Sequence, residues 1–128
     1  MKLTLFIILA SLLLLTNESC KKKDSVNVEG YWVGKWGFGT GSPNENMAVI
    51  FRKNGTVRVL YGYVTDTSTA GFRFEDTYSI SDSELRFSYV ETGKRFIHVA
   101  KPSNKRLEGT WGQSPSTTNG GLYFLDKR

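Results

Sequence analysis

The feature that most constrains the fold is a period-two alternation of apolar and polar residues over the C-terminal three quarters of the chain. In its clearest example, Leu85, Phe87 and Tyr89 alternate with Arg86 and Ser88. Successive side chains of a β-strand point to opposite faces, so this alternation is typical of strands buried on one face only. No segment of this region has the 3.6-residue periodicity of a long amphipathic helix. The pattern therefore predicts an all-β domain.

Turn-forming residues divide this region into eight expected strands. Their ranges are 31–38, 46–52, 56–63, 71–80, 85–89, 95–101, 106–111 and 121–127. Between the second and third lies Asn54-Gly55, which predicts a hairpin whose two turn residues both have positive φ. Because the connections are short, sequential strands are expected to pair antiparallel. Eight strands can close into an up-and-down barrel, which is the predicted fold, and a two-sheet sandwich is the alternative.

The N-terminal segment has a different character from the rest of the chain. Lys2 precedes an almost wholly apolar run, Leu3 to Leu15. As a helix of about 13 residues it would extend about 20 Å, less than the hydrocarbon core of a bilayer at about 30 Å. Residues 1 to 19 are therefore expected to be a cleaved signal peptide and not a permanent membrane span.

Cys20, the only cysteine, follows this leader directly and cannot form an internal disulfide. Residues 1 to 20 resemble the signal peptides of bacterial lipoproteins, with Asn17 where that family usually has Leu. The resemblance implies that Cys20 carries palmitate-type acyl chains and that residues 20 to 28 tether the protein to the outer membrane of a bacterial cell envelope. Two or more acyl chains make such attachment stable. The alternative is an ordinary secreted protein with an unpaired cysteine.

The formal net charge is +5, and Lys21 to Lys23 contribute to it directly after Cys20. The other charges are spread along the chain with acids between them. Because the sequence has no basic patch interleaved with aromatic residues, nucleic acid is not an expected partner. The lysine run is consistent either with contact to lipid head groups or with a solvated tether.

Each of the three tryptophans, Trp32, Trp36 and Trp111, has a glycine two residues earlier. Residues i and i+2 share one face of a strand, so a glycine there would leave room for the indole ring to lie over the backbone. Small barrels also need interior positions that alternate between small and large side chains. The spacing therefore indicates that the tryptophans point inward.

Gly30-Tyr31-Trp32 resembles the Gly-x-Trp motif on the first strand of lipocalins and related calycins, and the resemblance covers residues 29 to 128. It implies an eight-stranded up-and-down barrel with the Trp32 indole closing one end. It also implies that a basic residue late in the chain, Lys127 or Arg128, packs over that indole.

Aromatic residues are the main candidates for a binding site. The alternation is expected to place nine of them on apolar, inward-facing positions. These are Trp32, Trp36, Phe51, Tyr61, Phe74, Phe87, Tyr89, Trp111 and Phe124. They would either line a ligand cavity or fill a solid core, and an eight-stranded barrel allows both.

The sequence offers little for catalysis. His98 is the only histidine, and it is expected to be a partly exposed strand residue, with a polar contact inside a pocket as the alternative. Glu75 and Asp76 are adjacent on a strand and should point to opposite faces. The sequence has no metal-ligand spacing, phosphate-binding loop or nucleophile elbow. It therefore predicts a protein that is not an enzyme and has no metal or cofactor.

Two functions remain open. In the first, a lipid-anchored envelope protein binds a small hydrophobic or amphipathic ligand inside its barrel. In the second, a barrel with a filled core is an interaction module, an inhibitor or accessory subunit, that contacts another envelope protein. Its binding loops would be the polar segments 40–45, 65–70 and 113–119.

Overall fold

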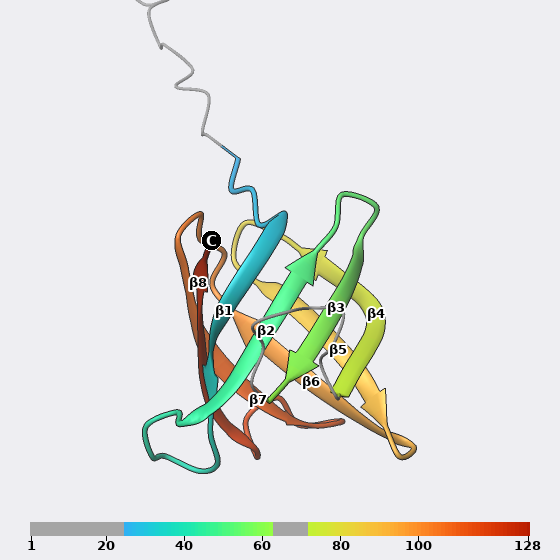
Figure 1. Ribbon diagram of the computed structural model, residues 1–128, viewed down its shortest axis with the longest axis vertical. Helices are drawn as coiled ribbons and strands as arrows, with labels where there is room; N and C mark the ends of the chain where they lie inside the picture. The colour runs from blue at the N-terminus through green and yellow to red at the C-terminus, as the bar shows by residue number, and fades with distance from the viewer. Residues whose placement is uncertain (1–24, 63–71) are drawn as a thin grey trace, which may run out of the picture.

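The computed structural model describes residues 25–62 and 72–128, which form a closed barrel of eight antiparallel strands in sequence order (Figure 1). The strands are β1 (Gly30–Trp36), β2 (Glu45–Phe51), β3 (Thr56–Tyr61), β4 (Phe72–Ile80), β5 (Leu85–Glu91), β6 (Lys94–Ala100), β7 (Arg106–Gln113) and β8 (Gly121–Lys127). This confirms the predicted all-β, up-and-down barrel and excludes the sandwich. The expected signal peptide, Cys20 and the loop 65–70 lie outside the described residues. Within these two ranges, no helix is long and apolar enough to cross a membrane.

The barrel closes through the pairing of β1 with β8. In this seam Trp32 is paired with Lys127, and Trp36 with Tyr123. Every other pairing joins strands that are consecutive in the chain. All eight strands therefore have a neighbour on both sides, and the shortest pairing joins residues 78–80 of β4 to residues 85–87 of β5.

Two of the tight turns differ in geometry. At the hairpin between β2 and β3 only Gly55 has a positive φ, and its amide donates to the Arg52 carbonyl at 3.1 Å. The expectation of two positive-φ residues at Asn54-Gly55 was wrong, because the loop has three residues and ends in a single left-handed glycine. Two consecutive residues with positive φ occur instead in the turn between β5 and β6, where φ is 50° at Thr92 and 75° at Gly93.

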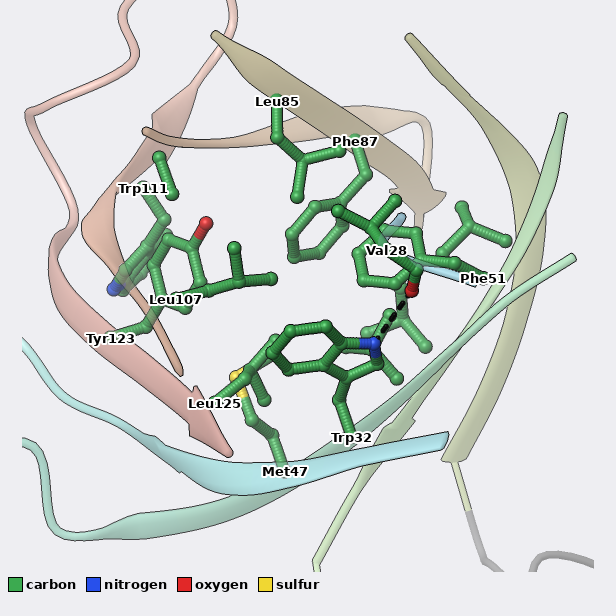
Figure 2. Packing of buried hydrophobic residues seen from close by; sticks show 14 of the residues in the cluster. Val28, Trp32, Met47, Phe51, Leu85, Phe87, Leu107, Trp111, Tyr123 and Leu125 are labelled. Atoms are coloured by element: carbon green, nitrogen blue, oxygen red, sulfur yellow. Dashed lines mark hydrogen bonds between the residues drawn. The ribbon is translucent and has the colours of Figure 1, made fainter. Parts of the chain in front are cut away.

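The end of the barrel where the chain enters is closed by Trp32, which has no exposed surface. Its indole lies across the interior, and its Nε1–H donates to the Val28 carbonyl at 2.7 Å (Figure 2). Lys127 Nζ lies 5.6 Å from the Trp32 ring centroid and donates to the Asn27 carbonyl at 2.9 Å. The basic residue over the indole is therefore Lys127, whereas Arg128 donates its backbone amide to Tyr31.

Val28 belongs to the folded core and not to a tether. It is 2% exposed and packs in the main hydrophobic cluster with Trp32 (Figure 2). The expected tether extended to residue 28 because the segment is polar and lacks strong periodicity. Its one apolar anchor, Val28, seals the barrel end from outside the sheet, and strand periodicity does not detect such a contact.

The glycines near the tryptophans have a different role from the expected one. A Cβ on Gly34 would overlap the Phe124 carbonyl, and a Cβ on Gly109 would overlap the Val99 carbonyl. These two glycines therefore permit close approach of neighbouring strand backbones. The glycine that an indole covers is Gly120, where a Cβ would meet the Trp111 ring at about 2.5 Å.

Candidate ligand-binding site

The barrel is hollow at the end opposite Trp32. A cavity of about 460 Å³ opens there. At this end of the barrel β1 and β3 end and β2 and β4 begin (Figure 1). We call this end of the barrel the mouth. The described residues that line it are Trp36, Phe38, Glu45, Asn46, Tyr61, Gly62, Phe72, Phe74, Tyr89, Glu91, Phe96 and Trp111. Eight of the twelve are aromatic, so the walls are apolar and rigid.

The aromatic walls are held by contacts among themselves. Trp36 packs edge-to-face on Trp111, with ring centroids 5.3 Å apart, and on Tyr61 at 5.4 Å. On the other side Phe74 stacks on Tyr89 at 4.6 Å. The Trp111 indole also donates to the Gly37 carbonyl at 2.9 Å, which fixes its orientation. These contacts form without a ligand, so the site is largely preorganised.

The rim of the mouth exposes apolar surface. Phe38 is 71% exposed and Phe72 is 61% exposed, although both are large aromatic residues. Phe38 packs against Trp36 and Trp111 with centroid distances of 5.0 and 5.5 Å. An exposed aromatic rim that continues into an apolar cavity is typical of a surface that binds another molecule.

His98 lies below the cavity, fully buried. Its ring stacks on Phe87 with centroids 4.6 Å apart, and its Nε2 is 3.4 Å from the Tyr61 hydroxyl. Within the described residues its Nδ1 has no hydrogen-bond partner. Burial lowers the pKa of His98 to about 3, so the imidazole is neutral near pH 7. The expectation of a partly exposed residue was wrong, because a neutral imidazole packs among aromatic rings as another flat ring does.

The tyrosines around this region keep their protons. Burial raises the pKa of Tyr61 well above its ordinary value and raises that of Tyr89 to about 12. The Tyr123 hydroxyl is buried and has no hydrogen-bond partner in the described part of the chain, and burial raises its pKa as well. Near pH 7 these hydroxyls are neutral groups that donate and accept hydrogen bonds.

Of the nine aromatic residues expected inside, five line the cavity: Trp36, Tyr61, Phe74, Tyr89 and Trp111. Three others, Trp32, Phe51 and Phe87, are buried in the core below it (Figure 2). The cavity therefore occupies one end of the barrel, and the other end is solid.

Phe124 is the exception. It lies on the outer face of β8, with the Arg106 guanidinium 4.3 Å from its ring centroid. Its expected inward position was wrong, because Tyr123 and Leu125, at 2% and 0% exposure, occupy the inner face of this strand. Leu122 to Leu125 form a run of four apolar residues, so alternation does not distinguish the two faces.

The predicted site residues did not include six side chains that line the mouth. They are Phe38, Glu45, Asn46, Phe72, Glu91 and Phe96. Phe96 could have been found, since it shares a strand face with His98. Most of the other residues lie at or just beyond strand ends: Phe38, Glu45, Phe72 and Glu91. They line the mouth because the closed barrel brings these strand ends together, which local alternation does not show.

The paired carboxylates of β4 bind different arginines. Glu75 forms ion pairs with Arg52 and Arg58, and Asp76 forms one with Arg95 at 2.9 Å. The arginines lower the pKa of Glu75 below its ordinary value, mainly through the hydrogen bond from Arg52. In the described ranges, no cluster of three or more His, Cys, Asp and Glu residues is arranged to hold a metal ion.

The class of this protein is assigned from its fold and its site, because comparisons with known proteins do not assign one. No protein-family model, curated protein or solved structure matches this chain. The closed eight-stranded antiparallel barrel is consistent with a lipocalin-like fold. Together, fold and site define a small up-and-down β-barrel with one solid end and one aromatic-lined mouth.

Proposed function

We propose that this protein binds a small apolar or amphipathic molecule in the mouth of its barrel. The observation that carries the proposal is the cavity of about 460 Å³ with eight aromatic lining residues. Its volume lies within the range of about 300–1,000 Å³ that is typical of small-molecule sites. A core filled to normal packing density would leave no such space, so the cavity favours ligand binding over a solid interaction module.

The chemistry of the interior also favours binding over catalysis. The one imidazole is neutral, buried below the cavity and stacked on Phe87. The nearby tyrosines stay protonated because burial raises their pKa values. A general base needs a pKa near the working pH, and none of these groups has one.

A titration with a neutral fluorescent probe such as N-phenyl-1-naphthylamine tests the proposal. We expect saturable binding that Trp36→Leu weakens at least tenfold, because this substitution removes a wall of the cavity. Phe38→Ala should also weaken it, and the high exposure of Phe38 makes a folding defect from this change small.

Phe124→Ala is the matched control, since it removes an aromatic ring from the outer face of the barrel. Its affinity for the probe should equal that of the unmodified protein. If a panel of apolar and amphipathic probes shows no saturable binding, the proposed function is wrong.

We further propose that the protein is held at a bacterial outer membrane by acyl chains on Cys20. The support is the apolar leader that ends at this single cysteine and the lysines that follow it. On expression in a Gram-negative host, radiolabelled palmitate should be incorporated and the protein should partition with detergent. Cys20→Ser should abolish both, and an unmodified thiol in the mass of the mature protein would contradict the anchor.

The alternative function, an envelope interaction module, draws support only from the exposed rim residues Phe38 and Phe72. It requires a protein partner that crosslinks to the rim in solubilised membranes. Loss of that crosslink in Phe38→Ala, together with no probe binding in the cavity, would favour this alternative.

A further inference from the structure

We propose that the ligand is an organic cation, an amine or quaternary ammonium group on an apolar body, bound between the aromatic walls and the carboxylates Glu45 and Glu91. This inference rests on the proposed ligand-binding function and specifies the chemical class of the ligand. It follows from which charged side chains the mouth presents.

The only charged residues among the described lining residues are acids. Glu45 and Glu91 lie on opposite sides of the mouth, at the start of β2 and the end of β5. Although the whole chain has an excess of five positive charges, no lysine or arginine lines the cavity among residues 25–62 and 72–128. The site therefore has the opposite sign of charge to the protein as a whole.

Glu91 is placed to act on the interior of the cavity. It is half-buried and shares a face of β5 with Tyr89, two residues earlier. Burial is the main cause of the raised pKa values of Tyr61 and Tyr89, and the negative charge of Glu91 adds a smaller contribution to both. Removed from full solvent screening, such a charge interacts more strongly than one on the open surface.

Two lysines lie close to these carboxylates in the strand register and form no ion pair with them. Lys94 is paired with Glu91 across the turn, but no ion pair joins them. Lys35 donates to the Asn46 amide oxygen at 3.0 Å. Neither Glu45 nor Glu91 takes part in a salt bridge within the part of the chain that the structure describes.

The aromatic walls complement a cation as well. The face of an indole, phenol or phenyl ring carries partial negative charge and attracts a cation within about 6 Å of its centroid. Eight such rings surround the cavity, three of them from Trp36, Tyr61 and Trp111. An anionic ligand would instead lie beside two carboxylates, with no cationic group among the lining residues that the structure describes, which is unfavourable.

Calorimetric titration with two ligands of nearly the same shape tests the inference. Benzyltrimethylammonium and neopentylbenzene differ mainly in charge, because a nitrogen in one replaces a carbon in the other. We expect the cation to bind at least tenfold more tightly, and phenylpropionate, an anion, to bind most weakly. Glu91→Gln should reduce the affinity for the cation severalfold and leave the affinity for neopentylbenzene unchanged.

Glu108→Gln is the matched control, because Glu108 is an exposed carboxylate on β7 that pairs with Arg106 and does not line the mouth. Equal affinities for the cation and its neutral counterpart, or a cation affinity unaffected by Glu91→Gln, would overturn this inference and leave the proposed function standing. If N-phenyl-1-naphthylamine and both ligands fail to bind, the proposed function fails with it.

Discussion

At the scale of single residues, His98 shows how a titratable side chain becomes part of an apolar core. It is fully buried, stacked on Phe87, and contacts one hydroxyl, that of Tyr61. Burial penalises the charged form of the imidazole, so the folded barrel holds it neutral. The ring then contributes to packing and gives the stability of the barrel a dependence on pH.

The sign of that dependence follows from the pKa values. Burial lowers the pKa of His98 to about 3 from an ordinary value of 6.5. Between these values the unfolded chain binds a proton that the folded barrel does not, so the free energy of unfolding rises with pH. The contribution is fully present above pH 6.5 and is lost as the pH falls toward 3, with a slope approaching about 1.4 kcal/mol per pH unit.

Urea unfolding between about pH 5 and pH 7 measures this effect, in a window where most carboxylates stay ionised. We expect the unfolding free energy to fall with pH in the unmodified protein. In His98→Phe, which keeps a flat ring in the core, that fall should be much smaller. Equal slopes in the two proteins would show that His98 is accessible to protons in the folded state.

Individual side chains mark the limit of prediction from sequence. Tyr61, Tyr89 and Trp111 were predicted inside because each lies on a strand with one clear apolar face. The position of Phe124 could not be predicted, since its strand is apolar on both faces. Glu91 was missed because its role depends on which other strand ends surround it, and no local pattern carries that information.

At the scale of elements, the turn between β5 and β6 is a site of backbone strain. Thr92 has φ of 50°, a left-handed conformation that a β-branched residue rarely adopts. Two-residue hairpins of this geometry favour Asn at the first position and Gly at the second. The second position, Gly93, already follows that rule.

Thr92→Asn should therefore stabilise the barrel, by up to about 1 kcal/mol, because Asn adopts the left-handed region more readily. Thermal unfolding of the variant is the measurement, and the expected result is a higher midpoint temperature. Gly93→Ala is the control and should lower the midpoint temperature, because alanine adopts the positive φ of this position less readily than glycine. A lower midpoint for Thr92→Asn would show that the Thr92 side chain makes a stabilising contact.

A substitution at Gly34 tests how closely the backbones of β1 and β8 pack against each other. An added Cβ would overlap the Phe124 carbonyl, and a strand backbone in a closed barrel has little freedom to move. We expect Gly34→Ala to destabilise the protein by about 1–3 kcal/mol. Gly41→Ala, in the loop between β1 and β2, should have little effect because its nearest neighbour is an ordinary contact at 3.9 Å. Urea midpoints of the two variants give the comparison.

All eight strands were predicted in the right order, and every boundary agrees within two residues. This succeeded because most strands have a clear alternation and because turn residues separate all of them. The failures lie where packing acts across elements. Phe38 continues an aromatic run but follows the end of β1, and Val28 precedes β1 yet fills the end of the barrel.

At the scale of the whole molecule, the two ends of the barrel have separate roles. Trp32 and Val28 make one end solid, while Trp36 and Trp111 surround the cavity at the other. Stability and binding should therefore respond to different substitutions. The division also explains why two tryptophans of the same motif on one strand, Trp32 and Trp36, differ in function.

Trp32→Phe should lower the free energy of unfolding by about 1–3 kcal/mol, because it leaves the buried Val28 carbonyl without its donor. Probe affinity at the mouth should stay within twofold of the unmodified protein. Denaturant unfolding and probe titration on the same sample measure both quantities. A large loss of affinity in a folded Trp32→Phe protein would show that the two ends are coupled.

The proposed anchor gives the barrel a direction. Val28 is fixed in the closed end, eight residues after Cys20, a span of at most about 28 Å when extended. Acyl chains on Cys20 would therefore hold the closed end nearer the bilayer than the mouth. A ligand would then enter from the aqueous side.

The seam between β1 and β8 has one more consequence. The Arg128 amide donates to the Tyr31 carbonyl at 2.9 Å, and Lys127 binds the backbone of Asn27, so the two limits of the folded domain are neighbours. If a short peptide joined them, the chain could be cut in the turn between β2 and β3, beside Asn54. All strand pairings of the barrel would be kept. In the circularly permuted chain β3 would be the first strand and β2 the last, and the cavity would be unchanged.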